Sequence, residues 1–296
     1  MKMNQIILVL AVIACLIFSA GCTAAPAASQ SAVIQPIQPI QPPAPVSLAE
    51  TPVQYKEVNG VRLAYWEFGS EGEPILLIEG FGGTVANSTP LQDSWNETFL
   101  SILSSKYHVY AYDHRGMGYS STNNATPTIA LYADDAAGLI TALGYDSMHV
   151  YGESMGSSTA QQLAIDHPER VRKLILDSNT YDARVPECST LLSILTQAAN
   201  DPSQTQGVRD EARANLAWNG TWDGLSAIQK DTMLVVGTDD SLTPEEISVR
   251  MAGQINGSWL VRFKGLPHCG SHYAPVQYGE NVLYFLGMNE APLGIQ

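Results

Sequence analysis

Residues 148–166 read MHVYGESMGSSTAQQLAID and contain the pattern Gly-x-Ser-x-Gly at 152–156, with Ser154 at its centre. The apolar run at 148–151 predicts a short buried strand, and the small and polar residues after the pattern predict a helix that continues to 166. A turn this tight between a strand and a helix needs glycine on both sides of the serine, because larger side chains would collide with the neighbouring elements. The serine hydroxyl is then held clear of the sheet, beside the N-terminus of a helix.

Outward from this segment, strand-like and helix-like stretches alternate along residues 51–296. Short apolar runs predict strands buried on both faces, and the longer stretches between them predict helices. This alternation predicts an α/β fold with a mostly parallel sheet and helices on both faces. Ligands of such sheets bind at the carboxyl ends of the strands, so the residues after each strand are the candidates for a site. The predicted strands are 61–68, 74–79, 107–112, 148–151, 173–176, 232–236 and 259–263, and the predicted helices are 98–104, 128–143, 156–166, 244–254 and 275–286.

Motifs at these strand ends resemble those of the α/β-hydrolase superfamily, and the resemblance covers nearly all of residues 55–290. Within that superfamily, the chain most resembles exported prokaryotic hydrolases of unassigned substrate. The resemblance implies the α/β-hydrolase fold with a small helical cap, and Ser154 as a nucleophile activated by a histidine that an acid orients. Besides the serine motif, the matching stretches are GFGG at 80–83, DHRGMGYS at 113–120, HPERV at 167–171 and GTDD at 237–240 with Pro244.

The superfamily order is serine, then an acid after a late strand, then histidine near the C-terminus. Asp240 fits the acid, because it takes the last position of the GTDD motif, shortly after the strand predicted at 232–236. Asp239 is the alternative acid. Asp240 has an alternative role as a turn residue that caps the helix starting at Pro244.

The stretch FKGLPH at 263–268 ends where the superfamily places its catalytic histidine, so the resemblance implies His268 as the base. Pro267 stands where the superfamily normally has glycine, which alters the loop and leaves the imidazole in place. His272 is the histidine most easily confused with His268, and we expect it to be a polar loop residue. We expect Arg115 to be structural.

The resemblance also implies an oxyanion hole formed by the backbone N–H groups of Met155, directly after the serine, and Phe81, in the glycine-rich loop. The residue before this loop is Glu79, where the superfamily usually has histidine. Glu79 is expected either to replace a structural hydrogen-bonding group or, near the oxyanion hole, to have a raised pKa or to disfavour anionic substrates. No Gly-Lys-Ser/Thr follows the loop, so no nucleotide site and no cofactor are expected.

The stretch of about 50 residues at 180–231 is too long for an ordinary loop, and we expect a small helical cap over Ser154. Trp218, Trp222 and Tyr181 are candidates either for an acyl or alcohol pocket or for the core of the cap. Cys188, in the cap, and Cys269, beside the predicted base, lie too far apart in sequence to suggest a metal site. A disulfide between them is left open.

Residues 1–22 predict an export signal. Lys2 precedes an apolar run at 6–18 that is too short to span a bilayer comfortably. Ser19-Ala20-Gly21-Cys22 resembles the lipobox of prokaryotic lipoproteins, although Ser19 departs from the usual branched aliphatic residue. We therefore expect a lipid anchor at Cys22 on the outer face of the cell membrane. Plain secretion and an uncleaved hydrophobic anchor are the alternatives.

Residues 23–50 are rich in Ala, Pro, Ser and Gln and contain Ile-Gln-Pro three times in succession at 34–42. Proline at every third position favours polyproline II, so we expect an extended tether, with an SH3-type ligand as the alternative. The folded domain is expected at 51–296.

The composition limits the partners. Of 296 residues, 45% are hydrophobic, which is enough for a full core. Residues 1–50 contain one lysine and one glutamate, so residues 51–296 carry the net charge of −14. This acidic balance argues against nucleic acid and against a basic membrane-binding patch. The expected partners are a small-molecule ester, lactone or amide substrate and a membrane reached through the lipid anchor.

The expected function is that of a cell-surface serine hydrolase that acts through an acyl-enzyme on small carboxylic esters or lactones. Ser154 is the expected nucleophile, His268 the base and Asp240 the acid. One alternative is a proline-iminopeptidase-like aminopeptidase, which would need an acidic site for the free amine of its substrate. The other is a non-catalytic ligand-binding surface protein with the same fold. The sequence does not predict the oligomeric state.

Overall fold

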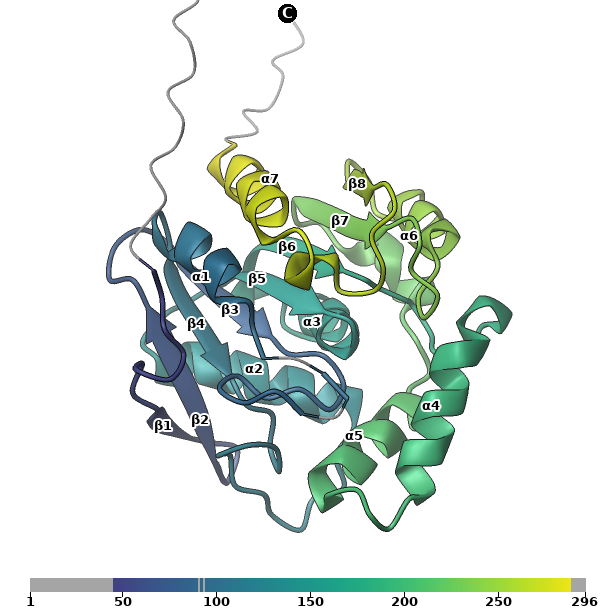
Figure 1. Cartoon of the computed structure of the whole chain (residues 1–296), viewed down its shortest axis with the longest axis horizontal. Coiled ribbons are helices and arrows are strands. Elements are labelled where there is room, and N and C mark those ends of the chain that lie inside the picture. Colours follow the sequence, from purple (N-terminus) through teal and green to yellow (C-terminus); the bar gives the residue numbers. More distant parts are fainter. Residues whose placement is uncertain (1–44, 90, 93, 289–296) are drawn as a thin grey trace, which may run out of the picture. The chain divides into compact units, whose positions relative to one another are not determined.

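The computed structural model describes residues 45–89, 91–92 and 94–288. The predicted signal peptide, Cys22 and the tether up to residue 44 lie outside these described residues. Within them, eight strands form one sheet in the order β1-β2-β4-β3-β5-β6-β7-β8 (Figure 1). β2 is antiparallel to both β1 and β4, and all other neighbours are parallel, so the predicted mostly parallel sheet is confirmed. The strands are β1 Gln54–Val58, β2 Val61–Phe68, β3 Pro74–Ile78, β4 His108–Tyr112, β5 Met148–Glu153, β6 Val171–Asp177, β7 Thr232–Gly237 and β8 Trp259–Phe263.

Helices cover both faces of this sheet (Figure 1). α1 and α7 pack together on one face and share a core with Ile75 and Leu77 of β3. α2, α3 and α6 belong to the core on the other face, with Leu76 and Ile78. Because consecutive residues of β3 enter opposite cores, its whole sequence PILLI is apolar and buried. The helices are α1 Glu97–Ser104, α2 Ile129–Ala142, α3 Met155–Asp166, α4 Ser189–Asn200, α5 Gln206–Ala217, α6 Glu245–Ala252 and α7 Pro275–Gly287.

Side-chain caps fix where several helices begin. Asn96, Thr128 and Thr205 accept hydrogen bonds from backbone N–H groups in the first turns of α1, α2 and α5. α3 differs, because its N-cap residue Ser154 makes no side-chain capping bond. The Ser154 hydroxyl is therefore available for another contact.

The N-terminal edge of the sheet was incompletely predicted, because β1 was missed. β1 pairs with β2 as a hairpin, and Asn59-Gly60 lies between them. That dipeptide is a strong sequence signal for a two-residue hairpin turn, so β1 was detectable.

The predicted boundary between tether and domain at residue 51 is wrong by several residues. The Leu48 side chain is buried, its N–H donates to Glu97 Oε1 at 2.7 Å, and the Val46 N–H donates to Ser101 Oγ at 2.7 Å. An apolar side chain next to a helix packs onto it even where the surrounding composition resembles a linker. The domain therefore already includes Val46.

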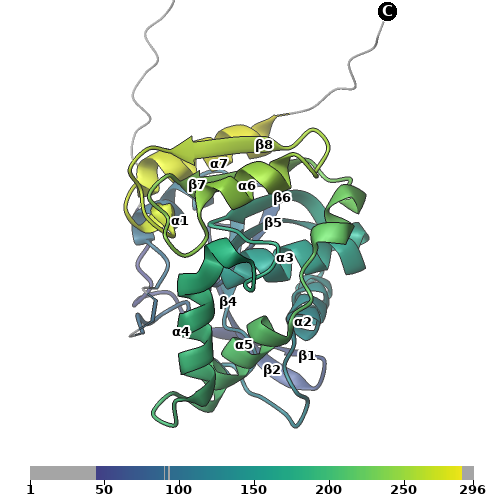
Figure 2. The same cartoon turned by 90° about the vertical axis from the view of Figure 1, so that its right-hand side faces the viewer.

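Between β6 and β7 the chain forms α4 and α5, which pack against each other as a helical hairpin (Figure 2). This hairpin lies where the sequence predicts a cap. In the described part of the chain, no helix is long and apolar enough to cross a membrane.

Candidate active site

Ser154 occupies a strained turn at the carboxyl end of β5. Its backbone has φ 54° and ψ −116°, a conformation that residues other than glycine rarely adopt. A Cβ atom at Gly152 would come within 2.2 Å of Gly156 O, and one at Gly156 within 2.0 Å of Ile78 O. Both flanking glycines are therefore required, as the sequence motif predicts.

Ser154, His268 and Asp240 form a continuous chain of hydrogen bonds. The distance from Ser154 Oγ to His268 Nε2 is 2.9 Å, and that from His268 Nδ1 to Asp240 Oδ2 is 2.8 Å. The loops after β5, β7 and β8 bring the three residues together. Asp239, the alternative acid, is exposed and its Oδ1 accepts a hydrogen bond from Thr238.

The surroundings of Asp240 keep it ionised and orient it. Burial alone raises its pKa, but hydrogen bonds and charge from His268, together with donors from Thr243, lower the pKa below its usual value. Two backbone N–H groups of the following turn donate to Oδ1 at 2.8 and 2.9 Å, so Asp240 orders this turn. It does not cap α6, whose N-cap residue is Pro244 and has no side-chain capping bond. Burial lowers the pKa of His268, whereas the carboxylates of Asp240, Glu153 and Asp177 raise it. The carboxylates have the larger effect, so the pKa of His268 is raised.

Glu153, directly before Ser154, holds the serine turn through buried hydrogen bonds. It is fully buried and accepts hydrogen bonds from Ser271 Oγ at 2.5 Å and Gln92 Nε2 at 3.0 Å, and it pairs with His272 Nε2 at 3.1 Å. Burial raises the pKa of Glu153, but His272 and Ser271 outweigh this effect and lower it. His272 thus belongs to this support and not to the chain that reaches Ser154. No role was predicted for Glu153, although it is part of the serine motif.

Glu79 is a buried carboxyl group beside the glycine-rich loop. In the described residues, no side-chain donor reaches its oxygens. Burial raises its pKa well above the usual range, and the negative charges of Glu153, Asp113 and Glu211 raise it further. Burial and these charges therefore favour the protonated, neutral form of Glu79.

A narrow pocket of about 10 Å³ lies beside Ser154, with room for about one water molecule. Phe81 and Met155, the predicted oxyanion-hole residues, both line it. Leu191 and Leu195 come from one face of α4, and their spacing was the sequence signal that could have identified them. The complete lining comprises Phe81, Ser154, Met155, Ser158, Thr180, Leu191, Leu195, Asn215 and Thr243.

The aromatic residues of the insertion do not line this pocket. Trp218 is buried and its Nε1 donates to Gln162 Oε1 at 3.0 Å. Tyr181 and Trp222 pack against each other with ring centroids 4.7 Å apart. Of the two roles left open by the sequence, Trp218 fits the core of the insertion, whereas Trp222 is exposed. Leucines of α4 take the place next to the serine.

Cys188 and Cys269 are both free and buried, so the disulfide that the sequence left open is not formed between them. Cys188 Sγ donates to Thr180 Oγ1 at 3.6 Å, whereas the backbone N–H of Cys269 donates to Ser178 Oγ at 2.8 Å. Burial raises the pKa of both thiols, that of Cys188 to about 11. A thiol with a raised pKa is a poor nucleophile.

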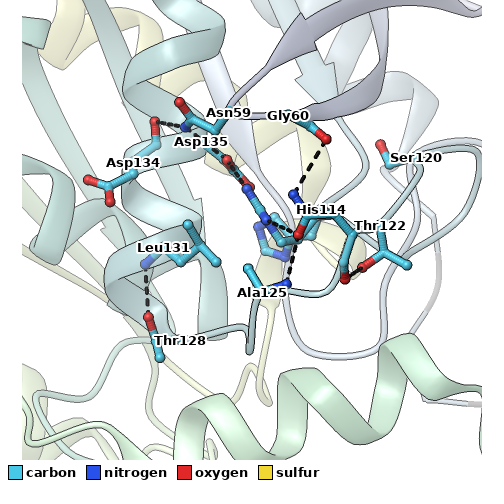
Figure 3. Close-up of polar contacts among 12 residues, drawn as sticks. Asn59, Gly60, His114, Ser120, Thr122, Ala125, Thr128, Leu131, Asp134 and Asp135 are labelled. Atoms are coloured by element: carbon cyan, nitrogen blue, oxygen red, sulfur yellow. Dashed lines mark hydrogen bonds and ion pairs between the residues drawn. The ribbon is translucent and has the colours of Figure 1, made fainter.

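Arg115 is held in a structural network away from the serine, as predicted. Its Nε and Nη2 atoms donate to the two carboxylate oxygens of Asp135 at 2.5 and 2.6 Å. Asn59 Nδ2 also donates to Asp135 and to the backbone of Asp134 (Figure 3). The network joins the turn after β4 to α2 and to the β1–β2 hairpin.

The described residues contain no group of three or more histidine, cysteine, aspartate or glutamate side chains that could hold a metal ion.

Comparison with known proteins identifies the fold. A family profile described as alpha/beta hydrolase fold matches residues 73–218. This chain has the α/β-hydrolase fold. A solved α/β-hydrolase fold protein from Chitinophaga pinensis is similar with a TM-score of 0.69 and 22% identity, over 82% of this chain and 100% of that chain.

Named relatives of this α/β-hydrolase-fold chain have different activities. RutD of Variovorax paradoxus, named provisionally as a carbamate hydrolase, is 28% identical over 75% of this chain and 95% of its own length. A dihydrolipoyllysine-residue acetyltransferase component of the acetoin cleaving system from Cupriavidus necator is 38% identical over 42% of this chain. The matched segment spans only 31% of that relative. With the fold, these similarities indicate a hydrolase.

Proposed function

We propose that this protein is a serine hydrolase that cleaves small carboxylic esters or lactones through an acyl-enzyme. The observation that carries this proposal is the unbroken hydrogen-bond chain from Ser154 through His268 to Asp240, beside a narrow pocket. A non-catalytic binding protein would not need a strained serine turn held against a histidine and an ionised carboxylate.

The proposed reaction follows from these contacts. Ser154 Oγ attacks the carbonyl carbon while His268 Nε2 takes the hydroxyl proton, and Asp240 stabilises the resulting imidazolium. The N–H groups of Phe81 and Met155 donate to the oxyanion of the tetrahedral intermediate. The bond to the alkoxy oxygen then breaks, and His268 gives its proton to that oxygen. A water molecule, deprotonated by His268, releases the acid from the acyl-enzyme.

The lining of the pocket supports a short, uncharged acyl group. The residues next to Ser154 are apolar or uncharged, and the pocket volume is small. An aminopeptidase of the proline-iminopeptidase type would need a carboxylate for the free amine, and the lining offers uncharged groups instead. The pocket therefore favours an ester or lactone over an aminoacyl amide.

Labelling with a fluorophosphonate tests this proposal directly. We expect purified residues 46–296 to be labelled at Ser154, and Ser154→Ala and His268→Ala to remove the label. Asp240→Asn should slow labelling on the order of 10⁴-fold, while Asp239→Asn, its matched control, should not. A folded wild type that is not labelled, or is labelled at another residue, would refute the proposal.

We also propose that the protein is anchored at the cell surface by a lipid on Cys22. The lipobox-like sequence before Cys22 and the proline-rich segment after it support this location. The domain would then meet small extracellular substrates while held near the membrane.

A further inference from the structure

The glycine-rich loop after β3 is a tight turn over residues 80–83. Gly83 N donates to Gly80 O at 3.1 Å, and Gly82 has φ 74°. A positive φ at the third residue is the signature of a type II turn, in which the central peptide is flipped relative to a type I turn. Here the central peptide joins Phe81 to Gly82. Its orientation fixes ψ of Phe81 and the direction of the Phe81 carbonyl, and so restrains the short turn that also carries the Phe81 N–H of the proposed oxyanion hole.

The N–H of this central peptide is held by a residue far along the chain. Gly82 N donates to Glu211 Oε2 at 2.8 Å, and Glu211 lies in α5, 129 residues away. The other carboxylate oxygen of Glu211 pairs with His114 Nδ1 at 3.0 Å. Both side chains are almost completely buried. Each oxygen of the Glu211 carboxylate thus has one partner, and both partners lie in loops at the carboxyl ends of strands.

The surrounding packing holds α5 in the position that this contact requires. One helical turn before Glu211, Gly207 lies so close to the turn after β4 that a Cβ atom there would be 2.2 Å from Gly116 O. Gly207 and Glu211 are on the same face of α5, so the helix contacts the loops after β3 and β4 with one surface.

We propose that Glu211 is a positioning residue that assembles the oxyanion hole from the cap, and this inference rests on the proposed function. A carboxylate accepts from the Gly82 N–H, whereas the flipped peptide would direct the Phe81 carbonyl oxygen at the same negative charge. Glu211 thus favours the one orientation of the central peptide. The pocket-lining helix α4 packs on α5, so the α4–α5 hairpin contributes both to the pocket beside Ser154 and to the oxyanion turn.

Steady-state kinetics with p-nitrophenyl acetate tests this role in the full domain, with active sites counted by fluorophosphonate labelling. We expect Glu211→Ala to lower kcat per active site by about 10-fold to 100-fold, with KM changed by less than about threefold. Glu211→Gln keeps an oxygen acceptor for Gly82 N–H and should restore most of kcat. Asp210→Ala, on the more exposed side of α5, is the matched control and should behave like the wild type.

A boronic acid that forms a tetrahedral adduct with serine gives a readout that general loss of stability would not produce. Its inhibition constant should rise in Glu211→Ala by the same factor by which kcat/KM falls, because both depend on the oxyanion contacts. Glu211→Asp keeps the charge but is one methylene too short, so it tests the same contact if Glu211→Ala fails to fold. An active wild type whose folded Glu211 variants keep kcat and the inhibition constant within about twofold would overturn this inference alone. An inactive wild type would overturn the proposed function and this inference with it.

Discussion

His268 determines the pH dependence of the proposed reaction, because only the neutral imidazole accepts the proton of Ser154. Burial lowers the pKa of His268, but the carboxylates around the imidazole raise it by a larger amount. The pKa therefore lies above the usual value of about 6.5. We therefore expect kcat/KM to rise with pH through a midpoint above about 6.5. Asp240→Asn should shift this midpoint downward, and Asp239→Asn should not. A pH profile of ester hydrolysis measures both, and a wild-type midpoint below that of free histidine would contradict the assignment.

Glu79 should make the stability of the protein depend on pH. Its pKa is raised in the folded state, so the folded state binds the extra proton. The free energy of unfolding therefore falls as pH rises above the unfolded pKa of about 4.3, by about 1.4 kcal/mol per pH unit, until the folded pKa is reached. Glu79→Gln is neutral at every pH and should be more stable than the wild type at neutral pH.

Urea unfolding of wild type and Glu79→Gln at several pH values measures this difference. The exposed Glu57→Gln is the control for loss of a negative charge. The stability gain of Glu79→Gln should disappear below about pH 4. A gain that stays constant from acid to neutral pH would show that Glu79 is ionised in the folded protein.

At the scale of elements, we expect α4 to limit the length of the acyl group that the proposed esterase accepts. The Leu195 side chain is buried and lines the pocket beside Ser154, whereas its neighbour Leu192 is only partly buried and does not line it. Leu195→Ala should raise the ratio of kcat/KM for p-nitrophenyl butyrate over the acetate by about 10-fold, because it enlarges the pocket by several carbon atoms. The variant should also lose about 2 kcal/mol or more of stability. Leu192→Ala should leave the ratio unchanged, and an unchanged ratio in Leu195→Ala would place the acyl group elsewhere.

The elements themselves were largely predictable. Buried strands such as β3 and β7 are uninterrupted apolar runs, and the helix after Ser154 follows a turn whose glycines are required by sterics. β1 was missed because an edge strand with one exposed face carries a weaker apolar signal. The insertion was predicted from its length alone, and length does not indicate which side chains of α4 face the serine.

At the scale of the whole molecule, the proposed lipid anchor should determine where the protein resides. In bacterial cells supplied with labelled palmitate, the wild-type chain should be labelled and recovered with the membrane fraction. Cys22→Ser should lose the label, while Cys15→Ser, which changes a cysteine inside the predicted signal, should keep it. Equal labelling of wild type and Cys22→Ser would refute the lipid anchor at this residue.

The sequence by itself determined the sheet-and-helix alternation and the glycines of the serine turn. These depend on side-chain periodicity and on steric limits within a few neighbouring residues. Only the tertiary structure decided that Asp240 and not Asp239 meets His268, that both cysteines are free, and that leucines rather than aromatic residues line the pocket. It also decided that Glu211 reaches Gly82. Such contacts depend on how elements distant in sequence pack against each other, and no local sequence pattern encodes that packing.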